Sequence, residues 1–244
     1  MTERIDAFTH LLPPSVVERL AAVHPTEELR SFGASRQLTD VQKRLADMDR
    51  YGVDRQVVTL AAPHLWDGVD PNDALDAVRF ANDEIRRVAD EHPDQFVPVG
   101  TLPFLSGPYV DEYDRCVEEL GMAGVQVFTN VGGRPLDDPD FRPFFERVNR
   151  SGRPLWLHPQ NVRSYDWVED SLDHKTLAWP FDTTLAVSRL VFGGVMDDCP
   201  DLEVIPHHAG GMLPMVAERM VSFAQTRRED EMYVEDVGGL AEPV

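Results

Sequence analysis

The sequence predicts one α/β domain over residues 1–244, folded as a TIM-type (β/α) barrel. Six short apolar segments alternate with six segments of helical periodicity, an order typical of parallel strands joined by right-handed crossovers. Neither a G-x-G-x-x-G turn nor a P-loop occurs, which argues against an open nucleotide-binding sheet. Polar residues, several of them histidines, end the apolar segments, at the rim where such a barrel gathers its functional groups.

The strand segments are short and apolar, and the second is rich in β-branched residues, as expected for strands buried on both faces. They comprise residues 4–10, 54–62, 96–103, 124–130, 154–158 and 202–208. Pro206 interrupts the last segment near its end, because proline cannot donate to a ladder of hydrogen bonds.

The helical segments show apolar residues at spacings of three and four and recognisable ends. The first runs over Leu38–Met48 and should end at Gly52. The second should begin at Asp70-Pro71, where an N-cap is followed by proline in the first turn. The remaining helices are predicted at 109–120, 139–150, 182–195 and 211–227.

The composition is strongly acidic, with 23 Lys and Arg against 43 Asp and Glu and a net charge of −20. Such a field repels nucleic acid and anionic membranes, so neither is expected as a partner. The acidic residues are spread along the chain, which favours a halophilic protein over the alternative of an ordinary solvated surface. With neither a long apolar run nor a signal sequence, a cytoplasmic location is expected. Two cysteines outside any C-x-x-C pair predict no disulfide framework.

Three of the eight histidines end predicted strands, namely His10, His158 and His208. In a barrel those strand ends converge on one cavity, and neutral imidazole is a good ligand for zinc. The alternative is that each is an isolated structural histidine. Consecutive side chains of an extended strand point to opposite faces, so only one of His207 and His208 is expected to face the cavity.

Several segments together resemble one known family. They are IDAFTHLLP, RLADMDRYGVDRQVV, GVQVFTN, PLWLHPQ and VFGGVMDDCPDLEVIPHHAGGMLP, which span Ile5 to about Arg219. The chain resembles the amidohydrolase superfamily, in the branch of aminocarboxymuconate-semialdehyde decarboxylase and related aromatic-acid decarboxylases. The resemblance implies a distorted (β/α)₈ barrel, a metal-dependent hydrolase fold with one divalent metal, usually zinc.

The resemblance also implies roles for individual residues. In the family the metal is held by both histidines of an H-x-H motif, a histidine ending strand five and an aspartate ending strand eight. His10 and His158 match two of these ligands, and His208 matches the acid/base histidine of strand six. Arg36 is the counterpart of a substrate-binding arginine. We add His64, at a strand end, and Trp156, as an apolar wall, to the predicted substrate-binding residues.

Two features depart from the family pattern. Phe8 occupies the position of the first H-x-H histidine and offers no lone pair, although residues two apart on a strand face the same side. No G-S-D-x-P-like segment supplies the strand-eight aspartate. We therefore expect a barrel lacking its last two strands, whose exposed edges are covered in a homodimer or by a rearranged C-terminal segment, Glu229–Val244. A truncated reading frame is the alternative.

These observations predict a metal-dependent carboxy-lyase or hydrolase acting on a small unsaturated, aromatic or cyclic carboxylic acid. The metal ligands would be His10 and His158, with His208 as acid/base. The alternative, supported by Phe8 and the missing aspartate, is a catalytically silent, metal-poor relative that binds a ligand or partner.

Overall fold

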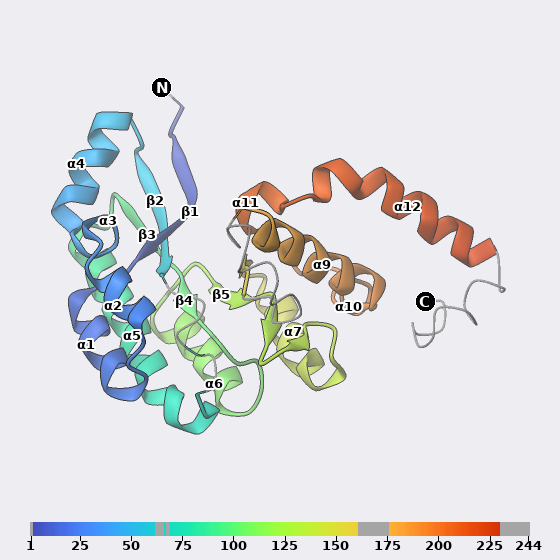
Figure 1. Cartoon of the computed structure of the whole chain (residues 1–244), viewed down its shortest axis with the longest axis horizontal. Coiled ribbons are helices and arrows are strands. Elements are labelled where there is room, and N and C mark those ends of the chain that lie inside the picture. Colours follow the sequence, from blue (N-terminus) through green and yellow to red (C-terminus); the bar gives the residue numbers. More distant parts are fainter. Residues whose placement is uncertain (1, 62–65, 67–68, 161–175, 230–244) are drawn as a thin grey trace.

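The structure is a computed structural model that describes residues 2–61, 66, 69–160 and 176–229 (Figure 1). All six predicted strands are present, and each pairs in parallel with its neighbours. They are β1 Ile5–Leu11, β2 Arg55–Leu60, β3 Phe96–Pro98 with β4 Gly100–Thr101, β5 Val125–Phe128, β8 Leu155–His158 and β9 Val204–Pro206. The strands lie in the order β1-β2-β3 and β4-β5-β8-β9.

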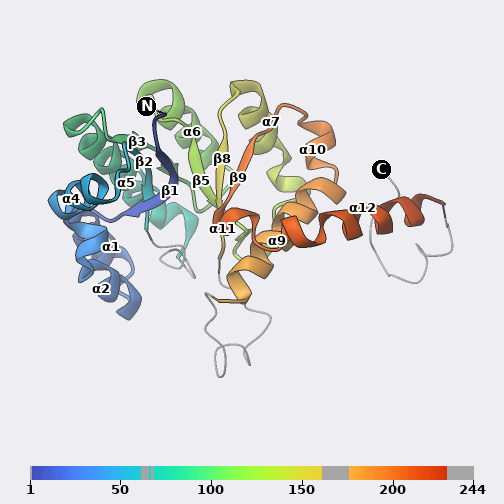
Figure 2. The ribbon, with the colours of Figure 1, turned by 90° about the horizontal axis from the view of Figure 1, so that it is seen from above.

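The third predicted strand is divided at Val99, where it joins the two sheets. The Val99 amide donates to the Val58 carbonyl of β2 at 3.0 Å, and the Gly100 amide donates to the Gly124 carbonyl beside β5 at 3.0 Å. Hydrogen bonding therefore continues from one sheet to the other. The two sheets form one curved wall of parallel strands, seen from above in Figure 2.

The curvature of this wall brings its distant strands together. β1 and β8 lie four positions apart in the strand order. A flat sheet would separate them by ~19 Å at ~4.8 Å per strand. Instead the indole Nε1 of Trp156 in β8 donates to the carbonyl of Ala7 in β1 at 2.8 Å. The described strands thus curl around a common interior, as in an α/β barrel.

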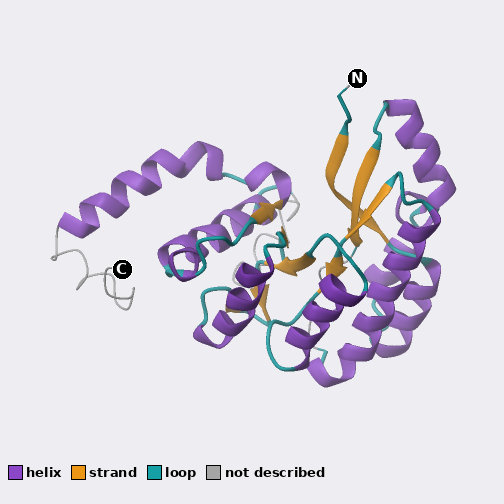
Figure 3. Ribbon diagram, turned by 180° about the vertical axis from the view of Figure 1, so that it is seen from behind, coloured by secondary structure: helices purple, strands orange, loops and turns teal. Residues whose placement is uncertain are grey.

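Helices cover the outer face of the strands (Figure 3). The described helices, of which α11 and α12 do not lie on this face, are α1 Pro14–Val23, α2 Glu27–Gly33, α3 Arg36–Thr39, α4 Val41–Tyr51, α5 Pro71–Glu91, α6 Pro108–Asp114, α7 Arg142–Ser151, α9 Ala178–Phe192, α10 Val195–Asp198, α11 His207–Gly210 and α12 Leu213–Glu229. A π-helical turn, Arg115–Glu119, extends α6, and a 3-10 turn, Pro139–Phe141, precedes α7.

The predicted helix ends are confirmed at two positions where the sequence contains a recognisable capping residue. Gly52 ends α4 in the left-handed region, with φ 64°, which glycine adopts without steric cost. The Asp70 side chain accepts from the Asn72 amide and caps α5, with Pro71 in the first turn. Helices α1 and α2 and the antiparallel hairpin of β6 (Asn130–Val131) with β7 (Arg134–Pro135) were not predicted.

The surface around α9 and α12 carries exposed apolar side chains. They are Leu177, Phe181, Leu185, Val191, Phe192, Met215, Val221 and Phe223. α12 extends away from the strands in Figures 1 and 2. None of the helices in the described ranges has the length and apolarity needed to cross a membrane. Both cysteines are buried and unpaired, which confirms the prediction that they form no disulfide.

Candidate metal and active site

Three histidines from distant parts of the chain meet at the carboxyl ends of the strands. They are His10 near the end of β1, His158 at the end of β8 and His207 directly after β9. One potential ligand atom from each lies within 4.8 Å of the other two. Ring centroids are 4.9 Å apart for His10 and His158 and 4.7 Å apart for His158 and His207. These distances place His10 and His158 next to one another at the carboxyl ends of their strands, as the sequence predicts.

The hydrogen bonds of His10 leave its Nε2 atom free to bind a metal. Nδ1 lies 2.8 Å from Thr59 Oγ1, directly across the β1–β2 ladder. The Thr59 hydroxyl donates its single hydrogen to the Thr9 carbonyl at 3.0 Å, so it accepts from His10. Nδ1 therefore carries the imidazole hydrogen and Nε2 carries the lone pair. Nε2 is buried without a hydrogen-bond partner among the described residues, which is the arrangement expected of an atom that binds a cation.

His158 is oriented in the same way by its own backbone. Its Nδ1 lies 2.7 Å from the Pro159 carbonyl, which can only accept, so Nδ1 is again the protonated nitrogen. The side chain is buried, at 3% exposure. A histidine whose second nitrogen donates to a carbonyl is the usual arrangement of a metal ligand, because this bond fixes the tautomer and the ring plane.

All three imidazoles are neutral at physiological pH. Burial lowers the pKa of His10 to about 4, with the charges of Arg44 and His208 as further causes. Burial also lowers the pKa of His207 to about 3 and that of His158 well below its usual range. Metal ligation requires the unprotonated imidazole, so the cluster is ready to bind a divalent cation without first losing protons.

The structure corrects the predicted geometry of the His207-His208 pair. β9 ends at Pro206 rather than at residue 208, and His208 and Ala209 both have φ 52°, in the left-handed region. Non-glycine residues enter this region at a cost of roughly 1–2 kcal/mol each. The His207 ring joins the cluster, and the His208 ring lies beside it, with centroids 4.1 Å apart, and stacks on Trp179 at 5.9 Å. Only one ring of the pair, His207 rather than the predicted His208, belongs to the three-histidine cluster, although the extended strand geometry predicted through residue 208 is wrong.

Glycine is required where this turn meets α9. A Cβ on Gly211 would lie 2.3 Å from the Pro180 carbonyl oxygen and 2.9 Å from Thr184 Oγ1. The same Thr184 hydroxyl accepts from the Met212 amide at 2.8 Å. The close approach to α9 thus holds the turn that carries both histidines.

Phe8 lies against the histidines, as its place in β1 predicts. Its ring is 4.4 Å from His207, 5.7 Å from His10 and 6.1 Å from His158, centroid to centroid. The β1–β2 register shifts between Asp6 and Thr9, a bulge of the kind that re-aims side chains beside functional sites. One wall of the site is therefore apolar at the point where an H-x-H motif would supply a nitrogen.

The predicted substrate-binding residues lie in different surroundings. Trp156 is buried in a small core cluster with Val57 and Val99, and its indole nitrogen is bonded to Ala7. Arg36 on α3 is exposed and pairs with Asp40 at 2.7 Å. His64 lies outside the described residues. No described contact joins Trp156 or Arg36 to the three histidines, and substrate contact by any of the three stays a prediction.

Sequence reasoning overlooked Asp182, a buried carboxylate on α9 that links the ends of two strands. It accepts from the hydroxyl of Thr129, after β5, and from the Gln160 amide, after β8, at 3.1 Å. Burial raises the pKa of Asp182 to about 6 from 3.8, against the lowering effect of these hydrogen bonds. No motif marks the residue, because its burial depends on how α9 packs.

The raised pKa gives a testable pH dependence. The folded state holds the Asp182 proton more tightly than the unfolded state, so this group stabilises the fold below pH 3.8 and loses that contribution as pH rises through about 6. In urea unfolding, Asp182→Asn should therefore gain stability relative to wild type by on the order of 2–3 kcal/mol between pH 4 and pH 7.5. Subtracting the wild-type stability curve from that of Asp182→Asn removes the contribution of histidine titration, which both proteins share. The control Asp76→Asn, at an exposed position of α5, should show no such gain in stability. A stability difference between Asp182→Asn and wild type that does not vary with pH would contradict the raised pKa of Asp182.

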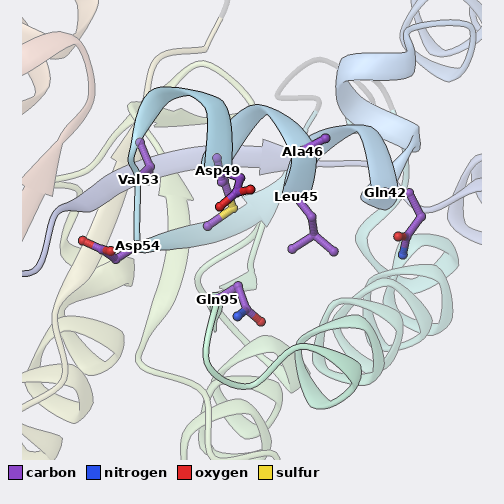
Figure 4. A pocket seen from close by; sticks show the side chains of 8 residues that line it. Gln42, Leu45, Ala46, Asp49, Val53, Asp54 and Gln95 are labelled. Atoms are coloured by element: carbon purple, nitrogen blue, oxygen red, sulfur yellow. The ribbon is translucent and has the colours of Figure 1, made fainter.

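A pocket of about 620 Å³ lies at the opposite end of the strands. It is lined by residues of α4 and by Val53, Asp54 and Gln95, which precede β2 and β3 (Figure 4). In α/β barrels the amino-terminal face contributes stability, and the chemistry is at the carboxyl face. The histidine cluster at the carboxyl face is therefore the candidate active site, and this pocket is not.

Comparison with known proteins gives the family of the chain. The chain matches the amidohydrolase family profile over residues 5–229. It is 33% identical over 186 residues to 2-amino-3-carboxymuconate-6-semialdehyde decarboxylase of Dictyostelium discoideum, covering 74% of this chain and 51% of the relative. It is 31% identical over 237 residues to gamma-resorcylate decarboxylase of a Rhizobium species, a match that covers 90% of this chain and 70% of that relative. The chain thus spans about half the length of the first relative.

Solved structures share the fold. 5-carboxyvanillate decarboxylase of Novosphingobium aromaticivorans, with manganese and 4-hydroxy-3-methoxy-5-nitrobenzoic acid, superposes with a TM-score of 0.82 at 25% identity, covering 95% of this chain and 72% of that one. 2,6-dihydroxybenzoate decarboxylase with bound 2,6-dihydroxybenzoate superposes with a TM-score of 0.76 at 28% sequence identity. The match covers 90% of this chain and 71% of that one. These matches confirm the predicted α/β fold of a TIM-type barrel, and with the profile match they show that the chain belongs to the amidohydrolase family.

Proposed function

We propose that this protein is a metal-dependent decarboxylase of a small aromatic or unsaturated carboxylic acid. The observation that carries the proposal is the cluster of three neutral imidazoles, with ligand atoms within 4.8 Å, at the carboxyl ends of the strands. The relatives named above are decarboxylases of such acids, which supports the same reaction class here.

The residues present fit a divalent metal. His10 and His158 would hold it through Nε2, the nitrogens that their hydrogen bonds leave unprotonated. A divalent metal, when bound, supplies Lewis-acid stabilisation of negative charge on the substrate. A solved relative contains manganese, while the nitrogen donors of this chain favour zinc among the abundant metals, so zinc is our specific proposal.

His208 is proposed to move the proton. In decarboxylation the bond between the ring carbon and the carboxyl carbon breaks, CO₂ leaves, and the electron pair of that bond takes up a proton at the ring carbon. His208 lies 4.1 Å from His207, ring centroid to ring centroid, and burial lowers its pKa, so its protonated form would be a stronger acid than free imidazolium. It would take a proton from solvent and deliver it to the ring carbon, which returns the imidazole to its neutral form. We further propose Arg36, His64 and Trp156 as contacts for the substrate carboxylate and ring.

A second candidate is a silent relative that binds a ligand without turning it over. Phe8 favours it, because this side chain occupies a ligand position without a lone pair. Hydrolysis of a cyclic ester or amide on the same site is the remaining enzymatic alternative.

Direct assays separate these functions. Protein loaded with one equivalent of Zn²⁺ or Mn²⁺ should release CO₂ from 2,6-dihydroxybenzoate or 5-carboxyvanillate, and metal-stripped protein should not. Hydrolysis of lactones and cyclic amides is measured in parallel. Turnover of the lactones alone would replace decarboxylase with hydrolase. Full metal occupancy with no turnover of either class, across a panel of aromatic and unsaturated acids, would favour the silent relative.

Self-association and salt adaptation also belong to the proposal. The exposed apolar side chains of α9 and α12 support a homodimer that covers this face. The net charge of −20 supports halophily. Both features, and the cytoplasmic location, stay predictions.

A further inference from the structure

His207 occupies a place that neither the family pattern nor its own strand predicts. Its ligand atom lies within 4.8 Å of those of His10 and His158, and its Nδ1 is buried without a hydrogen-bond partner in the described part of the chain. Buried polar atoms without partners are rare in folded proteins, and a cation is one of the accepted explanations. His207 is thus placed as a ligand would be.

Apart from its chain neighbour His208, at 4.1 Å, Phe8 has the ring nearest to that of His207, with centroids 4.4 Å apart. Position 8 is where the H-x-H pattern would place the first of its two histidines, on the same face of β1 as His10. The missing nitrogen at residue 8 and the additional nitrogen at residue 207 therefore lie side by side. A nitrogen that β1 does not supply is therefore available beside it, from the end of β9.

The backbone after β9 makes room for two histidines with separate tasks. In a continued strand, His207 and His208 would point to opposite faces and only one would reach the site. With the left-handed turn at His208 and Ala209, held against α9 through Gly211, His207 lies in the cluster and the His208 ring lies beside it at 4.1 Å, centroid to centroid. One imidazole can bind a metal while its neighbour remains free to carry a proton.

We propose that His207 replaces the lost H-x-H histidine, so that His10, His158 and His207 together bind one divalent cation and His208 is left unligated. Three imidazoles with an open fourth position form the ligand set of a catalytic metal site, in which tetrahedral geometry places the nitrogens about 3.3 Å apart. The ligand atoms, now within 4.8 Å of one another, would approach by up to about 1.5 Å on binding the cation. The inference rests on the proposed function for the presence of a metal, but not for the reaction.

The test compares matched alanine variants of the two neighbours, His207→Ala and His208→Ala. Metal-free protein is titrated with Co²⁺, and binding is followed by its visible absorption and by the paramagnetically shifted N–H resonances of ligated imidazoles. Wild type should show three such resonances. His207→Ala should show two and bind Co²⁺ at least about 100-fold more weakly, beyond the loss typical of an outer-shell partner. His208→Ala should keep all three resonances and lose less than about tenfold in affinity.

A second variant keeps the test independent of folding. Phe8→His in the His207→Ala background restores the H-x-H motif, and we expect the third resonance and most of the affinity to return. Circular dichroism confirms that each variant is folded. Wild-type affinity in His207→Ala, loss in His208→Ala instead, or no Co²⁺ binding by wild type each overturns the inference. Co²⁺ binding that depends on His207, in a protein without decarboxylase activity, would leave the inference standing and refute only the proposed reaction.

Discussion

Replacing His158 with alanine should abolish both metal binding and decarboxylation. The Nδ1–H of His158 is fixed on the Pro159 carbonyl at 2.7 Å, and its ring is 4.9 Å from that of His10 and 4.7 Å from that of His207. Its removal therefore takes away the ligand that contacts both others. We expect metal content to fall from one equivalent to below about one tenth, and kcat/KM to fall by more than ~100-fold, the upper range for outer-shell residues.

Metal content is measured by mass spectrometry on protein of verified mass, and activity by CO₂ release at saturating metal. His24→Ala, which removes a histidine at the end of α1, is the matched control and should retain both properties. Retention of a full equivalent of metal by folded His158→Ala would show that the cluster is not the metal site.

Replacing His208 with glutamine should have the second largest effect, and on turnover alone. The variant keeps a side chain of similar reach but cannot exchange a proton near neutral pH, so kcat should fall by ~10²–10⁴-fold, the usual range for general acid–base catalysis. Metal content and KM should change little, because His10, His158 and His207 remain. One limb of the pH–rate profile should disappear with the imidazole. A fully active variant would assign the proton transfer to another group.

The strands and several helix ends were predictable from local chemistry. The apolar segments of the six strands, the Asp70-Pro71 cap and the Gly52 stop each depend on residues next to one another in the chain, and the structure contains all of them. His10 and His158 were predictable as neighbours for a related reason. Each is at the carboxyl end of a parallel strand, and a barrel brings those ends together.

The role of His207 could not be read from the strand pattern. The prediction assumed extended geometry through residue 208, whereas the chain turns after Pro206 and two non-glycine residues enter the left-handed region. The signal available was Gly210-Gly211, since consecutive glycines after a proline-interrupted strand indicate an irregular turn. That signal predicts a turn but not which imidazole faces the cavity.

Other features could not be predicted from the sequence because they depend on packing between residues that are far apart in the chain. The indole of Trp156 reaches across the interior to Ala7, 149 residues away in the chain, so its bond to β1 was invisible to any local pattern. Asp182 is buried only because α9 lies over the ends of β5 and β8. A residue's type and sequence neighbours do not determine such contacts, which arise from the closure of the strand wall.

The most direct test is a crystal structure of the metal-loaded protein with anomalous data collected at the metal absorption edge. We predict one strong anomalous peak at about 2.0–2.3 Å from Nε2 of His10, Nε2 of His158 and a ring nitrogen of His207, with His208 outside bonding distance. A map without a peak among these three rings, or with the metal bound elsewhere on the chain, would contradict the account.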